Sequence, residues 1–384
     1  MGAWSLLVLA SSVLIACSSV AGSPAVQVTS ISVPSLSGQA ASFDVTEIDQ
    51  AAHLLYVADR TDVGVDVFDV STNHAAFVKT IAMPDAPNGL ALAPDLGRLF
   101  VGTAAGKVET VDISPTSKTA GTVVQELQTA GKEVDLMDYA PANHHLYASN
   151  GPEGTIANID AATGDISSVI NVGNALEQPR FDSANGLLYV TSPDIGSIVE
   201  IDPATGSIKN KTQLSACLPT GLAINPKSNQ AVIACDKAVY SYDIVSRKPI
   251  TVFNQVHGVD VVKYDAMADR FLVAAPRNRP HSAVALFGGS PIDYISSVNT
   301  DAGGNSAAYD EAHDMVYTPD TRAKTAGLAA FPAPHGGADL GLWVPYVGGL
   351  AVLLAVSLVL LVVVGRHADP IHRPETAEAQ PRHR

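Results

Sequence analysis

The chain has no basic stretch and is poor in positive charge. Its 384 residues include 23 Lys and Arg against 38 Asp and Glu, a formal net charge of −15. Without clustered Lys or Arg, nothing is present to follow a phosphate backbone, so we expect no nucleic-acid partner. Hydrophobic residues make up 47% of the chain. The chain is therefore long and apolar enough to bury a large core, and the acidic excess is typical of an exposed, soluble domain.

Sequence signatures of catalysis are also absent. The chain contains no G-x-S-x-G elbow, no P-loop and no G-x-G-x-x-G. Its eleven histidines are scattered, and the adjacent His144 and His145 would point to opposite faces of a strand. The cysteines and histidines form no zinc-like group and no C-x-x-C-H motif. We predict no catalytic residue, no metal ligand and no nameable cofactor.

Long hydrophobic runs occur only at the two ends of the chain. Residues 6–15 (LLVLASSVLI) are too few to span a bilayer and have the form of a signal-peptide core, although residues 1–5 lack the usual Lys or Arg. Two processing routes stay open. Either the peptide 1–21 is removed after Ser19-Val20-Ala21, or the segment ending at Cys17 is a lipobox and Cys17 is acylated.

The C-terminal run predicts a membrane anchor. No charged residue occurs between positions 340 and 365, and residues 346–365 alone would form a helix about 30 Å long. We predict a transmembrane helix at 342–365, with Trp343 and Tyr346 at the outer interface. Four arginines follow the span, which predicts a cytoplasmic tail at 366–384 and the bulk of the chain outside: Arg366, Arg373, Arg382 and Arg384.

The middle of the chain is a sevenfold repeat. Each unit has a short apolar segment, a turn and then a segment of the L-Y-V-A kind: 54–57 (LLYV), 98–101 (RLFV), 145–148 (HLYA) and 187–190 (LLYV), with looser versions at 230–233, 270–273 and 314–317. A third segment ends on an apolar residue followed by Asp in five units: Asp69, Asp112, Asp160, Asp202 and Asp243. These aspartates are 41 to 48 residues apart, and a fourth, more polar segment closes each unit. Four strands in that length predict the blade of a β-propeller.

The recurring aspartates are explained by the turns that follow them. Turns such as Ala161-Ala162-Thr163-Gly164 need a carboxylate to accept backbone N–H groups and a glycine at positive φ. We therefore predict that these aspartates are structural. The sixth and seventh units have Phe287-Gly288 and Phe331-Pro332 instead.

The seventh unit ends before its fourth strand. Residues 26–34 (VQVTSISVP) resemble the fourth strands of other units, such as 79–84 (KTIAMP). A strand from the N-terminus would complete the seventh blade and leave no edge unpaired. The sequence thus predicts an all-β, seven-bladed propeller at 26–334, joined by a linker at 335–341 to the C-terminal transmembrane helix.

The L-Y-V and apolar-Asp-x-x-T-G segments resemble the YVTN family of β-propeller repeats, and YncE-like bacterial proteins among them. The resemblance covers about residues 26–334. It implies a propeller and an exported protein. It also implies relatives that include propeller lactonases, but the motifs specify a blade and no activity.

Two cysteines remain in the propeller. Cys217 and Cys235 flank the first hairpin of the fifth unit, and pairing Asn225 with Gln230 would place Cys235 opposite Thr220. An oxidising compartment permits a disulfide. A disulfide and two buried thiols both remain open, because pairing cannot be fixed from sequence.

The mouth of the central channel is the usual ligand site of a propeller. Loops entering the first strands of six consecutive blades nominate Asn88, Asp135, Arg180, Thr220, His257 and Asn305. Arg180 and His257 suit an anionic small molecule, whereas Asp135 and the two amides suit a cation. The third alternative is that these residues hydrogen-bond loop backbone.

Two functions remain. The first is a membrane-anchored, single-pass, extracytoplasmic binding or interaction module for an unknown protein or small molecule. The alternative is a metal-dependent hydrolase or lactonase at the channel mouth. The lack of a catalytic constellation favours the first. An accessory subunit of an envelope complex is a further option, since Gly348 and Gly349 would let the span pack against another helix.

Overall fold

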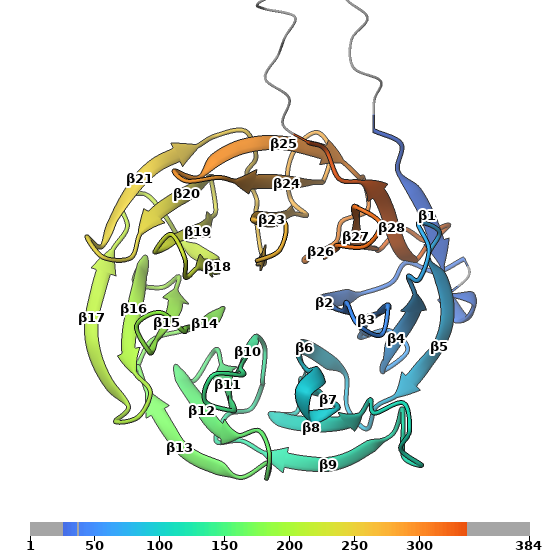
Figure 1. Ribbon diagram of the computed structural model, residues 1–384, viewed down its shortest axis with the longest axis horizontal. Coiled ribbons are helices and arrows are strands. Elements are labelled where there is room, and N and C mark those ends of the chain that lie inside the picture. Colours follow the sequence, from blue (N-terminus) through green and yellow to red (C-terminus); the bar gives the residue numbers. More distant parts are fainter. Residues whose placement is uncertain (1–25, 37, 336–384) are drawn as a thin grey trace, which may run out of the picture. The chain divides into compact units, whose positions relative to one another are not determined.

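The computed structural model describes residues 26–36 and 38–335. These residues form seven four-stranded antiparallel sheets arranged as blades around a central channel (Figure 1). The predicted all-β, seven-bladed propeller is confirmed. No helix in the described segments is long and apolar enough to cross a membrane. The predicted signal peptide 1–21, Cys17, the span 342–365 and the tail 366–384 lie outside the described residues, as does most of the linker.

In blades 1 to 6 the chain enters at the innermost strand and moves outward. Blade 1 consists of β2 (Phe43–Asp49), β3 (Leu54–Asp59), β4 (Gly64–Asp69) and β5 (Ala76–Ala82), and blade 2 of β6 (Pro87–Ala93), β7 (Arg98–Thr103), β8 (Lys107–Asp112) and β9 (Val123–Gln128). Blade 3 consists of β10 (Met137–Ala140), β11 (His145–Asn150), β12 (Thr155–Asp160) and β13 (Ile166–Asn171), and blade 4 of β14 (Pro179–Asp182), β15 (Leu187–Ser192), β16 (Ser197–Asp202) and β17 (Ser207–Gln213). Blade 5 consists of β18 (Pro219–Asn225), β19 (Gln230–Cys235), β20 (Ala238–Asp243) and β21 (Lys248–Phe253), and blade 6 of β22 (Val262–Asp265), β23 (Arg270–Ala275), β24 (Ala283–Gly288) and β25 (Asp293–Asn299). Two short 3-10 turns, η1 (Pro34–Leu36) and η2 (Pro94–Leu96), complete the elements.

Blade 7 is closed by the N-terminal strand, as predicted. Its order is β26 (Ala308–Asp310), β27 (Met315–Asp320), β28 (Gly327–Pro332) and β1 (Thr29–Ser32). β1 runs antiparallel to β28, with Thr29 opposite Ala330. After β1, Val33 and Leu36 are fully buried in a cluster that joins blades 7 and 1. The chain is therefore held in a ring by strand pairing and by apolar packing.

The L-Y-V segments form the second strands, and the recurring aspartates end the third. The middle strands are buried on both sides between neighbouring blades, so their sequences read as continuous apolar runs rather than alternating ones. The aspartates cap turns as predicted. The carboxylate of Asp69 accepts from the backbone N–H of Ser71 at 2.8 Å, and that of Asp160 from Ala162 at 2.9 Å. Gly164, four residues after Asp160, has the positive φ of 79° that its turn requires.

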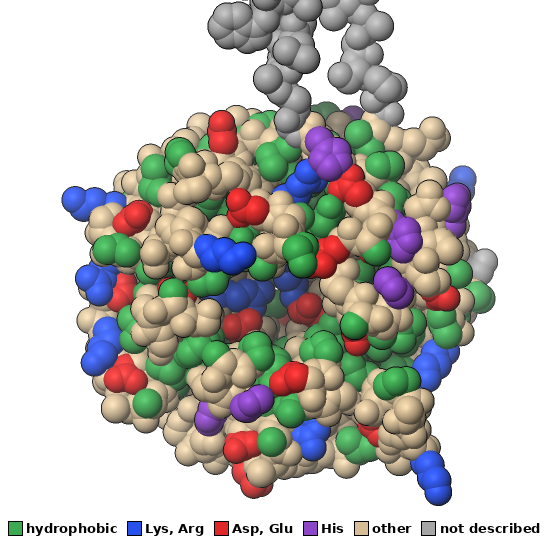
Figure 2. Space-filling model, viewed as in Figure 1, with side chains coloured by type: hydrophobic (Ala, Val, Ile, Leu, Met, Phe, Trp, Pro, Cys, Tyr) green, Lys and Arg blue, Asp and Glu red, His purple; other side chains and the backbone are tan. Residues whose placement is uncertain are grey.

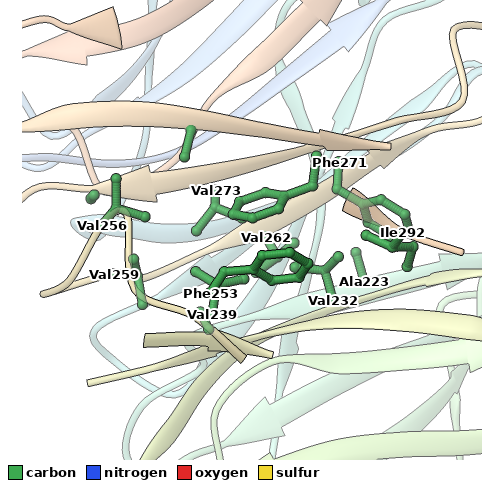
Figure 3. Close-up of a cluster of buried hydrophobic side chains, with 14 of the residues drawn as sticks. Ala223, Val232, Val239, Phe253, Val256, Val259, Val262, Phe271, Val273 and Ile292 are labelled. Carbon is green, nitrogen blue, oxygen red and sulfur yellow. The ribbon is translucent and has the colours of Figure 1, made fainter. Parts of the chain in front are cut away.

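The core lies between blades. Figure 3 shows one such layer, in which side chains of blade 5 interdigitate with those of blade 6. The ring centroids of Phe253 and Phe287 are 5.1 Å apart, in the favoured range for aromatic pairs. Truncating a buried Phe of this kind to Ala costs about 3–5 kcal/mol. Each blade is thus stabilised chiefly by its neighbours.

The ring has two faces, because successive strands are antiparallel. The mouth face carries the loops that lead into each first strand and those that join second to third strands. The turn face carries the turns that join first to second strands. The last described residues lie on the turn face, where the backbone N–H of Ala333 donates to the carbonyl of Asp314 at 2.9 Å. Figure 2 shows the ring hollowed at its centre, where acidic and basic side chains meet.

Candidate functional site

A cavity of about 220 Å³ opens where the channel meets the mouth face. Side chains reach it from the first strands and the adjoining loops of six blades, and we call it the acidic mouth. Its charged and polar lining residues are Asp44, Arg60, Asp135, Glu177, Thr220, Asp260, Arg277 and Asn305.

Three of the four carboxylates occupy equivalent positions. Asp135, Glu177 and Asp260 each stand two residues before the first strand of their blade. Each backbone N–H donates to a carbonyl near the end of the second strand of the same blade, at 3.1, 3.0 and 2.9 Å respectively. This repeated contact fixes the backbone at the point where the side chain leaves it. The fold thus places three carboxyl groups in one ring.

Two arginines reach the acidic mouth from loops that follow second strands. Arg60 forms an ion pair with Asp44, and its Nε donates to Oδ1 of Asn88 at 2.9 Å. Arg277 donates to Oδ2 of Asp260 at 3.2 Å. Each arginine therefore forms an ion pair with one carboxylate of the acidic mouth.

The other two carboxylates are not matched. Among the described residues, no ion pair and no hydrogen-bond donor reaches the carboxylate of Asp135 or that of Glu177. Both residues are partly buried and come from the adjacent blades 3 and 4. The acidic mouth therefore has an excess of negative charge on this side.

Burial in the acidic mouth makes ionisation costly. Burial raises the pKa of Asp44 to about 8, although Arg60 opposes the shift. Burial, and then the charge of Asp135, raises the pKa of Glu177 to about 8, and the pKa of Asp135 is raised by burial to about 6. Burial also raises the pKa of Asp260. Asp135, Glu177 and Asp44 therefore lose their protons at about pH 6 to pH 8.

Half of the six predicted residues meet in the acidic mouth, namely Asp135, Thr220 and Asn305. Asn88 lies directly behind it, 1% exposed. Its amide accepts from Arg60 and donates to Oε1 of Glu133 at 3.0 Å. Asn88 therefore positions an arginine of the site rather than lining it.

The structure places Arg180 in a different cavity. It lines a space of about 410 Å³ on the turn-face side of the channel, with Glu47, Asp138 and Lys263. There Nη1 of Arg180 lies 3.4 Å from Oδ1 of Asp138, and Lys263 pairs with Glu47. Arg180 is a residue of the innermost strand β14 itself, three positions beyond Glu177, so it points into the channel farther from the mouth face.

Gln178 stands between the two cavities. Its side chain is fully buried and bridges three blades. Oε1 accepts from the backbone N–H of Leu222 at 2.9 Å and of Val262 at 3.1 Å, and Nε2 donates to the carbonyl of Val262 at 2.9 Å. This bridge across the channel ties blade 4 to blades 5 and 6.

His257 lies on an exposed part of the loop before blade 6 and does not line the acidic mouth. Its Nε2 accepts from the backbone N–H of Arg279 at 3.3 Å, and the backbone N–H of His257 donates to Oδ1 of Asn278 at 3.2 Å. This is the loop-bonding role left open by the sequence.

Sequence reasoning missed five members of the acidic mouth: Asp44, Arg60, Glu177, Asp260 and Arg277. Arg60 and Arg277 follow second strands, and those ends share a face with the loops entering first strands. The repeat alone therefore predicts that residues directly after second strands lie near the channel mouth. Asp44 lies within a register shift between Phe43 and Thr46, and no sequence signal marks this irregularity.

The two propeller cysteines form a disulfide, with their Cα atoms 5.0 Å apart. The observed pairing differs by one residue from the expected one. Cys235 lies opposite Pro219, because the register shifts between Pro219 and Gly221. The shift brings the loop before β18 within reach, and the bond tethers that loop beside Thr220.

No group of three or more His, Cys, Asp or Glu side chains in the described part of the chain is placed to hold a metal ion. The carboxylates of the acidic mouth come from separate blades and face a cavity, and two of them are engaged by arginines.

Comparison with known proteins shows which solved structures share the propeller fold of this chain. No family model matches the chain. No curated protein matches it either. Solved structures do. "Crystal structure of RRP9 WD40 repeats" aligns with a TM-score of 0.63 at 11% identity, covering 80% of this chain and 99% of that one. "Structure of U3-55K" aligns with a TM-score of 0.64 at 11% identity, covering 79% and 98%. The chain shares the propeller fold with these WD40 structures. At this identity the likeness concerns the fold alone, and the resemblance to the YVTN family is not confirmed.

Proposed function

We propose that the protein is an interaction module whose acidic mouth receives a cationic group, a lysine or arginine side chain, from a protein partner. One observation carries the proposal. Both arginines of the acidic mouth already form ion pairs, and the carboxylates of Asp135 and Glu177 face the cavity without an ion pair, although the charge of Arg60 lowers the pKa of Asp135 against the effect of burial. A guanidinium or ammonium group entering the cavity would supply the missing charge and hydrogen-bond donors.

The scaffold supports such a role. A closed ring of blades holds the mouth loops rigidly, and loops on a rigid scaffold are where binding residues concentrate. The disulfide between Cys217 and Cys235 tethers one of these loops. The site is therefore preorganised, which lowers the entropic cost of binding.

We further propose that the module is exported and anchored by a single span. The signal-like segment 6–15, the uncharged run 340–365 and the arginines after it support a propeller on the extracytoplasmic side. The disulfide agrees with an oxidising compartment. The blade motifs support membership of the YVTN, YncE-like group. Acylation of Cys17 is the alternative fate of the N-terminus, and the mass of the mature protein decides between the two.

No observation in the described residues favours a metal-dependent hydrolase or lactonase.

The test uses a hexalysine peptide as the probe, at pH 9, which lies above the pKa of about 6 of Asp135 and of about 8 of Glu177, so that both carboxylates are largely ionised. The double variant Asp135→Asn/Glu177→Gln should weaken binding at least tenfold, or about 1.4 kcal/mol, because it removes both unmatched charges. The control, Asp165→Asn/Asp293→Asn, removes two carboxylates from exposed positions at the start of outermost strands, since Asp165 precedes β13 and Asp293 begins β25. Equal weakening in both variants would mean that the peptide responds only to net charge, and the proposal would fail.

A further inference from the structure

Blade 1 contains two aspartates buried against each other. Asp59 ends β3 and Asp66 lies in β4, and both are 0% exposed. Asp59 is opposite Gly64 and Asp66 is opposite Val57, so the two side chains are diagonal neighbours on one face of the sheet. Each carboxyl group affects the pKa of the other.

The remaining contacts of the pair leave room for one proton between them. Oδ1 of Asp59 accepts from the backbone N–H groups of Thr61 at 2.8 Å and Asp62 at 3.1 Å. Oδ1 of Asp66 accepts from the hydroxyl of Thr80 at 2.6 Å. The Oδ2 atom of each aspartate is buried and has no donor in the described residues. Two buried carboxyl oxygens can hydrogen-bond to each other only if one carries a proton.

Blade 7 contains the contrasting case. Asp320 ends β27 as Asp59 ends β3, and it is also fully buried. There Arg322, two residues later, donates to the carboxylate through Nε at 2.8 Å and Nη2 at 2.6 Å. In blade 1 the residue two positions after Asp59 is Thr61. The cation that compensates Asp320 is thus missing from blade 1, where Asp66 approaches instead.

The pair is connected to the acidic mouth through the turn that Asp59 caps. Arg60 is the next residue, and its backbone N–H donates to the carbonyl of Ser42 at 2.9 Å. Its side chain pairs with Asp44 and binds Asn88. The position of Arg60, and hence the charge balance of the acidic mouth, depends on the β3–β4 turn being held in place.

We propose that Asp59 and Asp66 share one proton. Loss of this proton as the pH rises makes the β3–β4 turn less rigid, and Arg60 is then held less firmly against Asp44 in the acidic mouth. Asp62 is the further charged group acting on both carboxyl groups, and its negative charge opposes loss of the proton. Burial raises the pKa of Asp66 to about 7 and also raises that of Asp59. The shared proton stands on its own, whereas its consequence for ligand binding rests on the proposed function.

Hydrogen exchange of the full-length protein, read by mass spectrometry, tests the proposal. After correction for intrinsic exchange, protection of the Thr61 and Asp62 amides should fall about tenfold between pH 6 and pH 8. The pKa of Asp66 is about 7, so the protonated fraction falls from about nine-tenths at pH 6 to about one-tenth at pH 8. Asp66→Asn replaces the acid with a neutral amide, so protection of this turn should no longer depend on pH.

Glu109→Gln is the matched control. Glu109 is the third residue of β8, as Asp66 is of β4, and it is fully buried without a tie to this turn. It should leave the pH dependence of the turn intact. Equal protection of the wild-type turn at pH 6 and pH 8 would overturn the proposal, as would a pH dependence that survives Asp66→Asn. Neither result involves the hexalysine peptide, so failure here and failure of the proposed function are distinguishable.

Discussion

The bridge made by Gln178 should contribute strongly to the stability of the ring. In Gln178→Leu the side chain keeps a similar volume but loses all three hydrogen bonds to blades 5 and 6. The amides of Leu222 and Val262 then point at an apolar group. The carbonyl of Val262 keeps a long contact of 3.4 Å with Arg180.

The expected magnitude follows from the two orphaned amides. A buried donor left without a partner costs about 1–3 kcal/mol, so Gln178→Leu should lower the free energy of unfolding by about 2–6 kcal/mol. The hydrophobic gain from the new side chain offsets part of this. A loss near the lower end is therefore expected if water reaches the amides from the acidic mouth, and a larger one if it does not.

Urea unfolding followed by far-UV circular dichroism and tyrosine fluorescence measures the change. The two tryptophans, Trp4 and Trp343, lie outside the propeller and do not report on it. Gln128→Leu is the control, because Gln128 is exposed and its amide donates to Gly106 at 2.9 Å. It should change stability by no more than about 0.5 kcal/mol. A loss below about 1 kcal/mol for Gln178→Leu would refute the reasoning.

Three further predictions concern the ring as a whole. Replacing Cys217 and Cys235 by Ser should lower the free energy of unfolding by about 3 kcal/mol, the chain-entropy value for the 18-residue separation, and wild-type protein in reductant should unfold at the same urea concentration as this variant. Ile31→Pro should break the pairing of β1 with β28 and raise the susceptibility of blade 7 to limited proteolysis, whereas unchanged cleavage would contradict closure by this strand. Burial, and then the charge of Asp85, raises the pKa of Glu109 to about 7, so the folded state favours the neutral acid. The free energy of unfolding should therefore fall as the pH rises from about 4.5 through 7. Glu109→Gln should make that decline less steep, and an unchanged dependence on pH would count against this prediction.

The sequence was sufficient to predict the fold, because each blade repeats the same solution. The apolar second strands, the Asp-capped turns and the N-terminal match to a fourth strand are all local patterns. Closure of the ring was predictable because the seventh unit lacks its fourth strand and the N-terminal segment has the sequence of a fourth strand without a unit of its own. The state of Cys217 and Cys235 remained open, since the register of their hairpin shifts by one residue between Pro219 and Gly221 and the sequence does not mark this shift.

The site was only half predictable, for two physical reasons. First, the repeat identifies which loops face the channel but not how far along a strand each side chain lies. Arg180 was therefore assigned to the acidic mouth, although Glu177, three residues earlier, occupies it. Second, the arginines come from a different set of loops, and their partners Asp44 and Asp260 have neutral or apolar neighbours that give no local signal.

The proposed function requires that Asp135 and Glu177 receive a cationic group. Carbodiimide coupling tests it directly, because the reagent joins a carboxylate to an amine in contact with it. The full-length protein is treated with hexalysine and carbodiimide, and the attachment points are mapped by mass spectrometry. We predict that the peptide is joined chiefly to Asp135 and Glu177. Attachment to exposed aspartates such as Asp165 and Asp293, with the acidic mouth unmodified, would contradict the claim.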